Sequence, residues 1–445
     1  MAFTHLLAAF TTALGGLLAL PSPPDAPASE PGPLTAATYY VDCAGSDGAS
    51  GTSPTSAWRT LGRASAAALG AGGRLLLKRD CTWWGQRLDA DWHGTEAAPV
   101  VVGAYGSGDD PRIWNGPYQG VKVSGSHVVL EQLVVGHSPS RFTSCGQPLG
   151  VYYGVNFTEG AHDSVLQDSL VTGSMAGVHL ARDSWANTVR RNVIAGNDVV
   201  DAFHADPAQD LGAWGVLVVS DDNDISWNQF VDNRAVCSNQ GYRLMSNSVE
   251  IFEGKRNRIH HNRSVGDRVF SELGGSWEEK AADNVFAYNR FANDLADSRF
   301  VVTRGSDESW GPVYRTTVVH NTTYLTGPRS QGVVCMSGCT PNILTMRWNL
   351  IWAEEKVLYA DGTFEASRNL FWSSDGDPFV QAPFAVPAIV ANPQFVDRWS
   401  ATLTLSAGSP AIDAGDVSTA WGVALNGVPL YQGWATELGA YERAD

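Results

Sequence analysis

Two glutamates, Glu250 and Glu272, occupy matching places in two short apolar segments of the chain, 22 residues apart. The segments read Val249-Glu-Ile and Val269-Phe-Ser-Glu-Leu, and such alternation is typical of β-strands whose successive side chains face opposite ways. If these strands stack in parallel, the two carboxylates are direct neighbours on the outward face, about 4.8 Å apart. Two carboxylates this close repel each other, so the pKa of one should rise, which prepares one acid and one nucleophile.

Carboxylates about 5 to 5.5 Å apart are the spacing of retaining glycosidases. We therefore predict Glu250 as the nucleophile and Glu272 as the general acid/base; these roles can also be exchanged, and Glu253, at the end of the same segment, can replace Glu250. The alternative is that all three glutamates are solvated strand residues. Like charges on adjacent strands destabilise each other, however, and that cost favours a catalytic or metal-binding role.

Further residues around these strands are candidates for binding a substrate. Lys255 follows Glu253, Arg304 ends the strand of the next coil, and His179 shares the outward row with Glu250. The other four candidates are two tryptophans in insertions and two polar residues in a long loop before Trp214, namely Trp277, Trp310, Asp201 and His204. Long loops on such scaffolds often form the wall of a site, although an ordinary Asp-rich surface loop is an equally simple interpretation.

The elements that must position these residues are set by a recurring Asn-centred motif. Its clear copies are Asn187-Thr-Val-Arg-Arg-Asn192, Asn223-Asp-Ile-Ser-Trp-Asn228, Asn257-Arg-Ile-His-His-Asn262 and Asn284-Val-Phe-Ala-Tyr-Asn289, with degenerate copies ending at Asp168, Asn321 and Asn349. The terminal polar residues fall 24, 36, 34, 27, 32 and 28 positions apart, and a period of 20 to 50 residues indicates a repeat architecture.

Each copy is strand-like, and a second short strand precedes it, without any segment long enough for a crossover helix. Strands that recur in this way can stack in parallel, one coil above the last, which predicts an all-β parallel β-helix. Asn suits a recurrent tight turn because it tolerates the left-handed conformation, and stacked Asn side chains can bond one another up a ladder. A β-sandwich or propeller does not explain one Asn position per coil.

The ends of the chain differ from the repeat. The apolar run from Leu6 to Leu20 is too short to span a bilayer and is typical of a signal peptide, with Ala26-Pro-Ala28 as the cleavage site. The sequence thus divides into a signal peptide (1–28), a linker (29–37), an N-terminal cap with first coils (38–125), the β-helix with its active face (126–390) and a C-terminal coil or cap (391–445). A short capping helix is expected from Trp58 to about Leu69.

Six cysteines behind a signal peptide fit disulfides formed in an oxidising compartment. Cys335 and Cys339 can close a local loop, and for the others we favour Cys43–Cys81 and Cys145–Cys237 among several possible pairings. A zinc site is disfavoured, because Cys-x3-Cys lacks a partner pair nearby. The formal charge of −16 argues against nucleic acid as a partner and disfavours an acidic polysaccharide unless a cation bridges.

The two ends of the mature chain carry a family resemblance. The opening Tyr-Val-Asp…Gly-Ser-Asp…Gly-Thr…Trp-Arg-Thr-Leu and the closing Gly-Ser-Pro-Ala-Ile-Asp-Ala-Gly and Leu-Gly-Ala-Tyr-Glu resemble secreted carbohydrate-active enzymes of the pectate-lyase-like superfamily. The resemblance implies a single-stranded, right-handed parallel β-helix. It leaves the reaction open, since this scaffold hosts lyases, hydrolases, esterases and non-enzymatic binders.

Two narrower resemblances point to different reactions. The segment Asp267-Arg-Val-Phe-Ser-Glu272-Leu-Gly-Gly resembles the acid-bearing strand of β-helix glycoside hydrolases of the family 120 and 141 type, whose nucleophile lies on the preceding coil; this chain has Glu where the family 120 β-xylosidases carry Asp. The segment Glu250-Ile-Phe-Glu-Gly-Lys255 resembles the chondroitinase and alginate lyase pattern, in which a Glu binds calcium and the Lys is the base. The Arg that those lyases carry on the next coil is absent here unless Arg268 or Arg304 replaces it.

The sequence therefore predicts a secreted, monomeric enzyme that acts on a polysaccharide or oligosaccharide, without a nucleic-acid or membrane partner and without a cofactor. The preferred reaction is retaining glycoside hydrolysis. One alternative is a polysaccharide lyase that uses Ca²⁺ and Lys255, and another is a non-catalytic glycan-binding solenoid.

Overall fold

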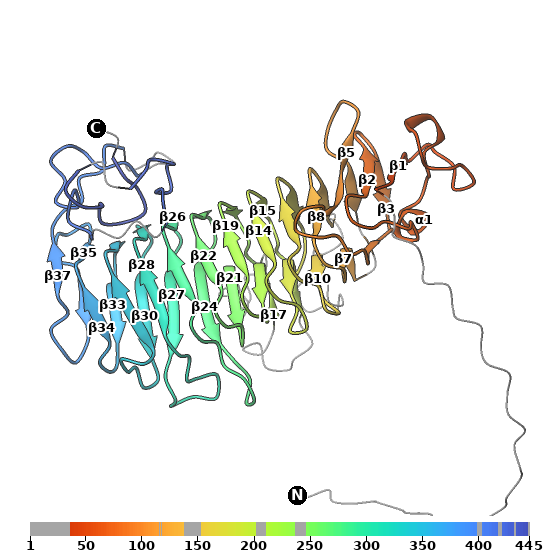
Figure 1. Cartoon of the computed structure of the whole chain (residues 1–445). Helices are drawn as coiled ribbons and strands as arrows, with labels where there is room; N and C mark the ends of the chain where they lie inside the picture. Colours follow the sequence, from red (N-terminus) through yellow and green to blue (C-terminus); the bar gives the residue numbers. More distant parts are fainter. Residues whose placement is uncertain are drawn as a thin grey trace, which may run out of the picture. The chain divides into compact units, whose positions relative to one another are not determined.

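Short parallel strands follow one another along nearly the whole chain and stack into three long sheets (Figure 1). The computed structural model describes residues 36–114, 116, 118–137, 153–201, 211–235, 246–397, 403–416, 421–430 and 433–443. The predicted signal peptide, the first part of the linker and the pair Cys145–Cys237 lie outside these residues. No helix in the described ranges is long and apolar enough to cross a membrane.

Each complete coil contributes one strand to each of the three sheets, which we call sheets A, B and C; β1 and β37 at the two ends belong to incomplete coils. Sheet A has 12 strands: β1 (Thr38–Val41), β2 (Arg74–Lys78), β5 (Val100–Tyr105), β8 (Val128–Glu131), β11 (Val165–Gln167), β14 (Thr188–Arg190), β19 (Asp224–Ser226), β22 (Arg258–His260), β25 (Val285–Ala287), β28 (Thr316–Val319), β31 (Leu344–Arg347) and β34 (Glu365–Ser367). Sheet B has 12: β3 (Thr82–Trp84), β6 (Arg112–Trp114), β9 (Val134–Gly136), β12 (Leu170–Thr172), β15 (Val193–Ala195), β20 (Gln229–Val231), β23 (Arg263–Val265), β26 (Arg290–Asn293), β29 (Thr322–Leu325), β32 (Leu350–Ala353), β35 (Asn369–Trp372) and β37 (Ala388–Val390).

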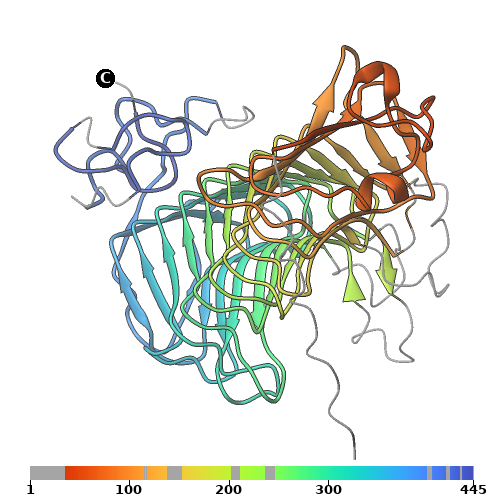
Figure 2. The ribbon, with the colours of Figure 1, turned by 45° about the vertical axis from the view of Figure 1, so that its right-hand side comes forward.

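Sheet C has 11 strands: β4 (Leu88–Ala90), β7 (Gln119–Val123), β10 (Tyr153–Phe157), β13 (Ala176–Leu180), β18 (Trp214–Val218), β21 (Asn247–Phe252), β24 (Val269–Gly274), β27 (Arg299–Arg304), β30 (Gln331–Met336), β33 (Lys356–Ala360) and β36 (Val380–Gln381). Outside the three sheets, β16 (Val200–Asp201) and β17 (Leu211–Gly212) form a small antiparallel pair. Figure 2, turned by 45°, shows the successive coils lying side by side along the solenoid. The predicted right-handed parallel β-helix is confirmed.

The interior of the coils is apolar and continuous. One inward position of sheet C holds Val155, Val178, Val216 and Val249 on successive coils, all fully buried. Such stacking grows the core by one layer per coil, so a long chain can fold without a globular core.

The expected Asn ladder is present, and the motif builds two ladders rather than one. At the corner between sheets A and B, the backbone N–H of each Asn donates to the side-chain oxygen of the Asn on the next coil, at 2.9–3.1 Å, from Asn192 to Asn369. The first Asn of each motif copy forms a second ladder between sheets C and A, from Asn187 to Asn284. The residue before each of these Asn rungs has a positive φ, which turns its side chain outward at the corner.

The N-terminal region contains less helix than expected. The helix α1 spans only Leu61–Ser65. It begins there because Thr60 caps its first turn by accepting a hydrogen bond from the N–H of Arg63 at 3.1 Å. Trp58 lies outside the helix, forms a bridge with Val41 and is buried in the core. A 3-10 turn, Pro54–Ser56, precedes it.

Two predicted disulfides are present. Cys43 bonds to Cys81, and Cys335 bonds to Cys339 within a local loop. The C-terminal residues 403–441 contribute Leu403, Leu425 and Tyr441 to an apolar cluster with Tyr324 and Trp352 on sheet B.

Candidate active site on sheet C

Glu250 and Glu272 are direct neighbours on the outer face of sheet C. Glu250 in β21 is the register partner of Glu272 in β24, so the two side chains project from adjacent coils about one strand spacing apart. The same outward row continues through Leu217 and His179 on the preceding coils and Val302 on the following one. The expectation that these two carboxylates lie side by side is confirmed.

Arg304 binds one member of this pair. It ends β27, lies two residues beyond the register partner of Glu272, and donates from Nη2 to Oε1 of Glu272. Its Nε lies 3.0 Å from Oε1 of Glu308, and its side chain is only 7% exposed. A buried guanidinium thus lies between the carboxyl groups of Glu272 and Glu308.

The other member of the pair has a different environment. Burial raises the pKa of Glu250 to about 8, and the charge of Glu272 adds to this increase, while Arg304 and a hydrogen bond from Asn247 oppose it. Nδ2 of Asn247, three residues earlier in the same strand, donates to Oε2 of Glu250. At neutral pH the two positions therefore hold one protonated carboxyl group, Glu250, beside one ion-paired carboxylate, Glu272.

Glu253 and Lys255 do not join this pair. Glu253 lies three residues after Glu250 and so outside the outward row; strand β21 ends at Phe252, and the φ of 76° at Glu253 turns the chain at the corner. Glu253 is buried at the corner, where it forms an ion pair with Arg182 and accepts a hydrogen bond from the N–H of Ser276 at 3.3 Å. Lys255 lies farther along the corner and pairs with Glu279 at 3.2 Å.

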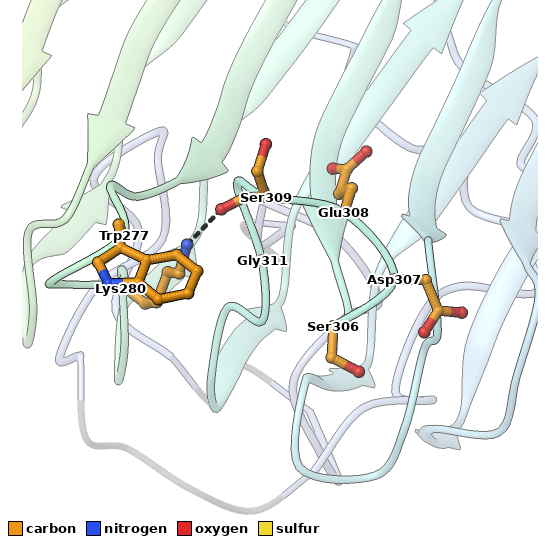
Figure 3. A pocket seen from close by; sticks show the side chains of 7 residues that line it. All are labelled: Trp277, Lys280, Ser306, Asp307, Glu308, Ser309 and Gly311. Atoms are coloured by element: carbon orange, nitrogen blue, oxygen red, sulfur yellow. Dashed lines mark hydrogen bonds between the residues drawn. The ribbon is translucent and has the colours of Figure 1, made fainter. Parts of the chain in front are cut away.

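Two insertions beside sheet C form a pocket of about 460 Å³ (Figure 3). Trp277, which is 95% exposed, and Lys280 come from the loop after β24, and Asp307 and Glu308 come from the loop after β27. Nζ of Lys280 donates to the backbone oxygen of Ser309 and so joins the two loops. Since Glu308 also contacts Arg304, the pocket is connected to Glu272 through a single guanidinium.

Trp310 lies in the same loop but not in the lining of this pocket. Its ring is 6.0 Å from that of Phe252, centroid to centroid, and it covers Gly274, where a side chain would meet Trp310 at 3.6 Å. Phe252 and Gly274 follow Glu250 and Glu272 by two residues on the outward face. Trp310 is 47% exposed, so an aromatic surface stands beside the carboxylate pair.

His179 lies on the same outward row, two coils before Glu250. Its Nδ1 is 2.9 Å from Oδ1 of Asn156, its ring stacks on Tyr153 at 4.2 Å, and burial lowers its pKa to about 4. A neutral imidazole can exchange hydrogen bonds with sugar hydroxyls. The backbone of Asp201 belongs to β16, but its side chain and the whole of His204 lie outside the described residues.

Asn247, Glu308 and Lys280 are the residues at this site that the sequence did not reveal. Glu308 lies four residues after Arg304 in the sequence. This spacing could have suggested a contact only in a helix, and Glu308 lies in a loop, so the sequence did not predict the contact. Calcium does not fit these residues well: it takes six to eight oxygen ligands, and here one of the two carboxylates is bound to Arg304. Among the described residues, only Asp42, Cys43 and Cys81 group three potential metal ligands, and both cysteines are in a disulfide.

Comparison with known proteins gives the fold but not the reaction. No protein-family model and no curated protein matches the sequence. The structure is similar to that of pectate lyase Pel9A, with a TM-score of 0.59 and 15% identity over 93% of this chain and 98% of that one. It is also similar to the GH136 lacto-N-biosidase from Eubacterium ramulus, with a TM-score of 0.51 and 13% identity over 79% of this chain and 67% of that one. At these identities the likeness concerns the right-handed β-helix, a scaffold shared by a lyase and a hydrolase. The narrower resemblance to families 120 and 141 stays a prediction.

Proposed function

We propose that this chain is a secreted carbohydrate-active enzyme, a retaining glycoside hydrolase that cleaves a polysaccharide or oligosaccharide. The observation that carries the proposal is the register pairing of Glu250 with Glu272 on an outward strand face, with unlike surroundings for the two carboxyl groups. A retaining glycosidase needs one protonated and one ionised carboxyl group at about this separation.

The surroundings favour the exchanged assignment of roles. Glu250, with its raised pKa, is the general acid that protonates the leaving oxygen, and Glu272 is the nucleophile that attacks the anomeric carbon. The C–O bond to the leaving sugar breaks as the bond from Glu272 to the anomeric carbon forms. Glu250, now ionised, then takes a proton from the water that releases the sugar from Glu272. His179, Trp310, and the loops that carry Trp277 and Lys280 line the face on which the substrate would lie.

The lyase alternative keeps the same face but needs a different base. Lys255 is its candidate, and Lys255 pairs with Glu279 at the corner rather than standing beside Glu250. A glycan-library digest with product analysis, with and without a chelator, separates the three functions. Hydrolysis yields reducing ends and survives chelation. Lysis yields an ultraviolet-absorbing unsaturated uronide and requires calcium, and a non-catalytic binder yields neither.

The roles of the two glutamates are tested on the substrate that the digest identifies. Glu250→Gln should lose about 10²- to 10⁴-fold in kcat/KM on the natural linkage but retain most of its kcat/KM on an aryl glycoside whose leaving group needs no protonation, while kcat falls on both because release from Glu272 loses its base. Glu272→Gln should lose activity on both. Glu365→Gln, which changes an exposed carboxylate of sheet A, is the matched control. Full activity of Glu272→Gln on a cleaved glycan would contradict the proposal.

A further inference from the structure

Five aromatic side chains form a continuous stack at the corner between sheets A and B. Trp227, His261, Tyr288, His320 and Trp348 stack in this order, with ring centroids 4.4, 5.2, 4.8 and 5.2 Å apart. Each precedes a ladder Asn and has a φ between 51° and 60°. The ladder thus fixes one outward-pointing ring per coil, and we call this row the aromatic column.

The C-terminal segment, by which we mean the described residues 403–416, 421–430 and 433–443, covers most of the aromatic column but not its first ring. His261, Tyr288 and His320 are 2–3% exposed, and Nε2 of His261 is 2.8 Å from the backbone oxygen of Val423. Trp227, one coil earlier, is 37% exposed. One face of the indole ring of Trp227 stacks on His261, and part of the ring remains exposed as a flat apolar surface.

A pocket of about 250 Å³ lies beside this ring. Its lining includes Trp227, His261, Gln229, Arg191, Arg263 and Leu425. Gln229 and Arg263 are register partners in β20 and β23, so an amide and a guanidinium stand on adjacent coils beside the exposed indole.

The two arginines of the pocket differ in their ion pairing. Arg191 is held by Asp168 through two hydrogen bonds of 2.8 and 2.7 Å. Arg263 makes no ion pair within the described residues. It also neighbours Arg290 in the register of β23 and β26, so its charge faces another positive charge. In a chain of net charge −16, the guanidinium of Arg263 is thus a cation without an ion-pair partner among the residues that the structure describes.

We propose that this pocket is a second carbohydrate-binding site, which takes a sugar residue that carries a carboxylate. The face of Trp227 would stack on the sugar ring, Gln229 would bond a hydroxyl group, and Arg263 would bind the carboxylate. The assignment of a sugar as ligand rests on the function proposed above.

The position of the site separates it from the catalytic face. Trp227 follows β19 of sheet A and precedes β20 of sheet B, whereas Glu250 and Glu272 stand on sheet C. A polymer held at Trp227 therefore leaves the outward row of sheet C open, so the second site can retain a long substrate while cleavage proceeds elsewhere on the chain.

Binding is tested by calorimetry in a Glu272→Gln background, which prevents turnover. The probes are an oligomer of uronic acid and the same oligomer after reduction of its carboxyl groups. Trp227→Asn removes the ring and keeps a residue that tolerates the left-handed backbone, and Arg263→Gln removes the charge. Trp185→Ala is the matched control, since Trp185 is also exposed and stacked on a histidine, His162, but at another corner.

The proposal expects Trp227→Asn to lose one binding site per chain for the uronate oligomer, or to bind it about tenfold more weakly, a change of about 1.4 kcal/mol. Arg263→Gln should bind both oligomers equally, and the control should behave as its parent. Undiminished binding by Trp227→Asn, or equal binding of the two oligomers by the parent, would overturn it. With Glu272 restored, Trp227→Asn should cleave a short soluble substrate at the same rate as the parent. This measurement depends only on the catalytic glutamates, so it separates an error in the proposed binding site from an error in the proposed catalytic function.

Discussion

At the residue scale, Glu250 and Glu272 occupy equivalent positions on adjacent strands, but the side chains around them differ. Both project from the same row of sheet C, but only Glu272 contacts the guanidinium of Arg304, and Glu250 is the carboxyl group that burial keeps protonated. A difference of this kind assigns acid and nucleophile without any special loop. The position of the pair could be predicted from alternation and spacing. Its asymmetry could not, because it depends on Arg304, which reaches across from another coil.

The first prediction concerns the alkaline limit of activity. A general acid must be protonated, so activity should fall as the pH rises through the pKa of Glu250, about 8. Arg304 lowers this pKa, and Arg304→Gln should therefore move the alkaline limb to higher pH while reducing kcat, because Glu272 loses its partner. The pH dependence of kcat/KM measures the shift.

Arg299→Gln is the control for that experiment, since Arg299 begins the same strand and contacts neither glutamate. An alkaline limb that stays in place in Arg304→Gln, or moves to lower pH, would show that Glu250 is not the group whose deprotonation limits the rate.

A second residue-scale prediction concerns Asp267, which ends a third, shorter row: the N–H of Asn197 donates to Asn233, and the N–H of Asn233 donates to Asp267. Asp267 is fully buried and accepts hydrogen bonds from the N–H of Asn233 at 2.6 Å and from Oγ of Ser248 at 2.6 Å. Burial raises its pKa to about 7, above its unfolded value near 3.8, so the native state holds a proton that the unfolded chain releases. The stability contributed by this group is therefore lost as the pH rises toward and through 7.

Asp267→Asn removes that titration. The free energy of unfolding of the variant minus that of the parent should be larger at pH 8 than at pH 5, as measured by chemical denaturation at both pH values. A difference in stability that is constant over this range would mean that Asp267 does not titrate in the folded protein.

At the element scale, the Asn motif fixes both the coil and the register. The repeat could be read from the sequence because each rung needs the same residue, and the register that it sets brought Glu250 beside Glu272. Glu253 was misplaced because it lies three residues after Glu250, an odd separation that points to the other face of the strand, and because its left-handed backbone turns the chain at a corner. Lys255 lies beyond the same turn. Alternation predicts faces within strands and fails at the residues that end them.

The third prediction tests the ladder. Asn262 is fully buried; its oxygen accepts from the N–H and side chain of Asn228 at 3.0 and 3.1 Å, and its Nδ2 donates to Ile225 at 2.8 Å and Asn289 at 3.0 Å. Asn262→Ala leaves several of these buried groups unsatisfied, at ~1–3 kcal/mol each, and should destabilise the protein by on the order of 3–5 kcal/mol.

Thermal and chemical unfolding measure this loss. The exposed Asn392, whose side chain accepts one local hydrogen bond from Gln394, provides the control Asn392→Ala. If both variants unfold alike, the ladder does not contribute the expected stability.

At the scale of the whole molecule, the C-terminal segment is held by contacts that no sequence pattern predicts. Its bonds to the coils join residues more than a hundred positions apart, as between His320 and the oxygen of Glu437, 117 residues away, at 3.3 Å. The segment has few regular elements of its own, and it covers the rings of the aromatic column. Its position depends on the ladder, because the left-handed residues before each Asn present these rings.

The last prediction is that acid loosens this segment. His260 lies between Asp224 and His261: its Nε2 is 2.8 Å from the carboxylate of Asp224, and its Nδ1 is 2.8 Å from Nδ1 of His261. The backbone oxygen of Val423 only accepts, so Nε2 of His261 carries a proton and donates to it. Burial lowers the pKa of His261, and also that of His320, to about 4.

Both values lie below the unfolded value near 6.5, so the unfolded chain binds protons that the native state excludes. The stability contributed by these histidines is present above pH 6.5 and is lost as the pH falls toward 4. Limited proteolysis within residues 403–443 should therefore become faster as the pH is lowered from 6.5 to 4.5. His261→Gln keeps a donor for Val423 without gaining charge, so it should reduce this acceleration, whereas His162→Gln, at another corner, should not. Equal acid sensitivity of His261→Gln and the parent would remove His261 from the mechanism, because His260, Asp224 and Arg258, the charged or titratable groups that act on it, are the same in both.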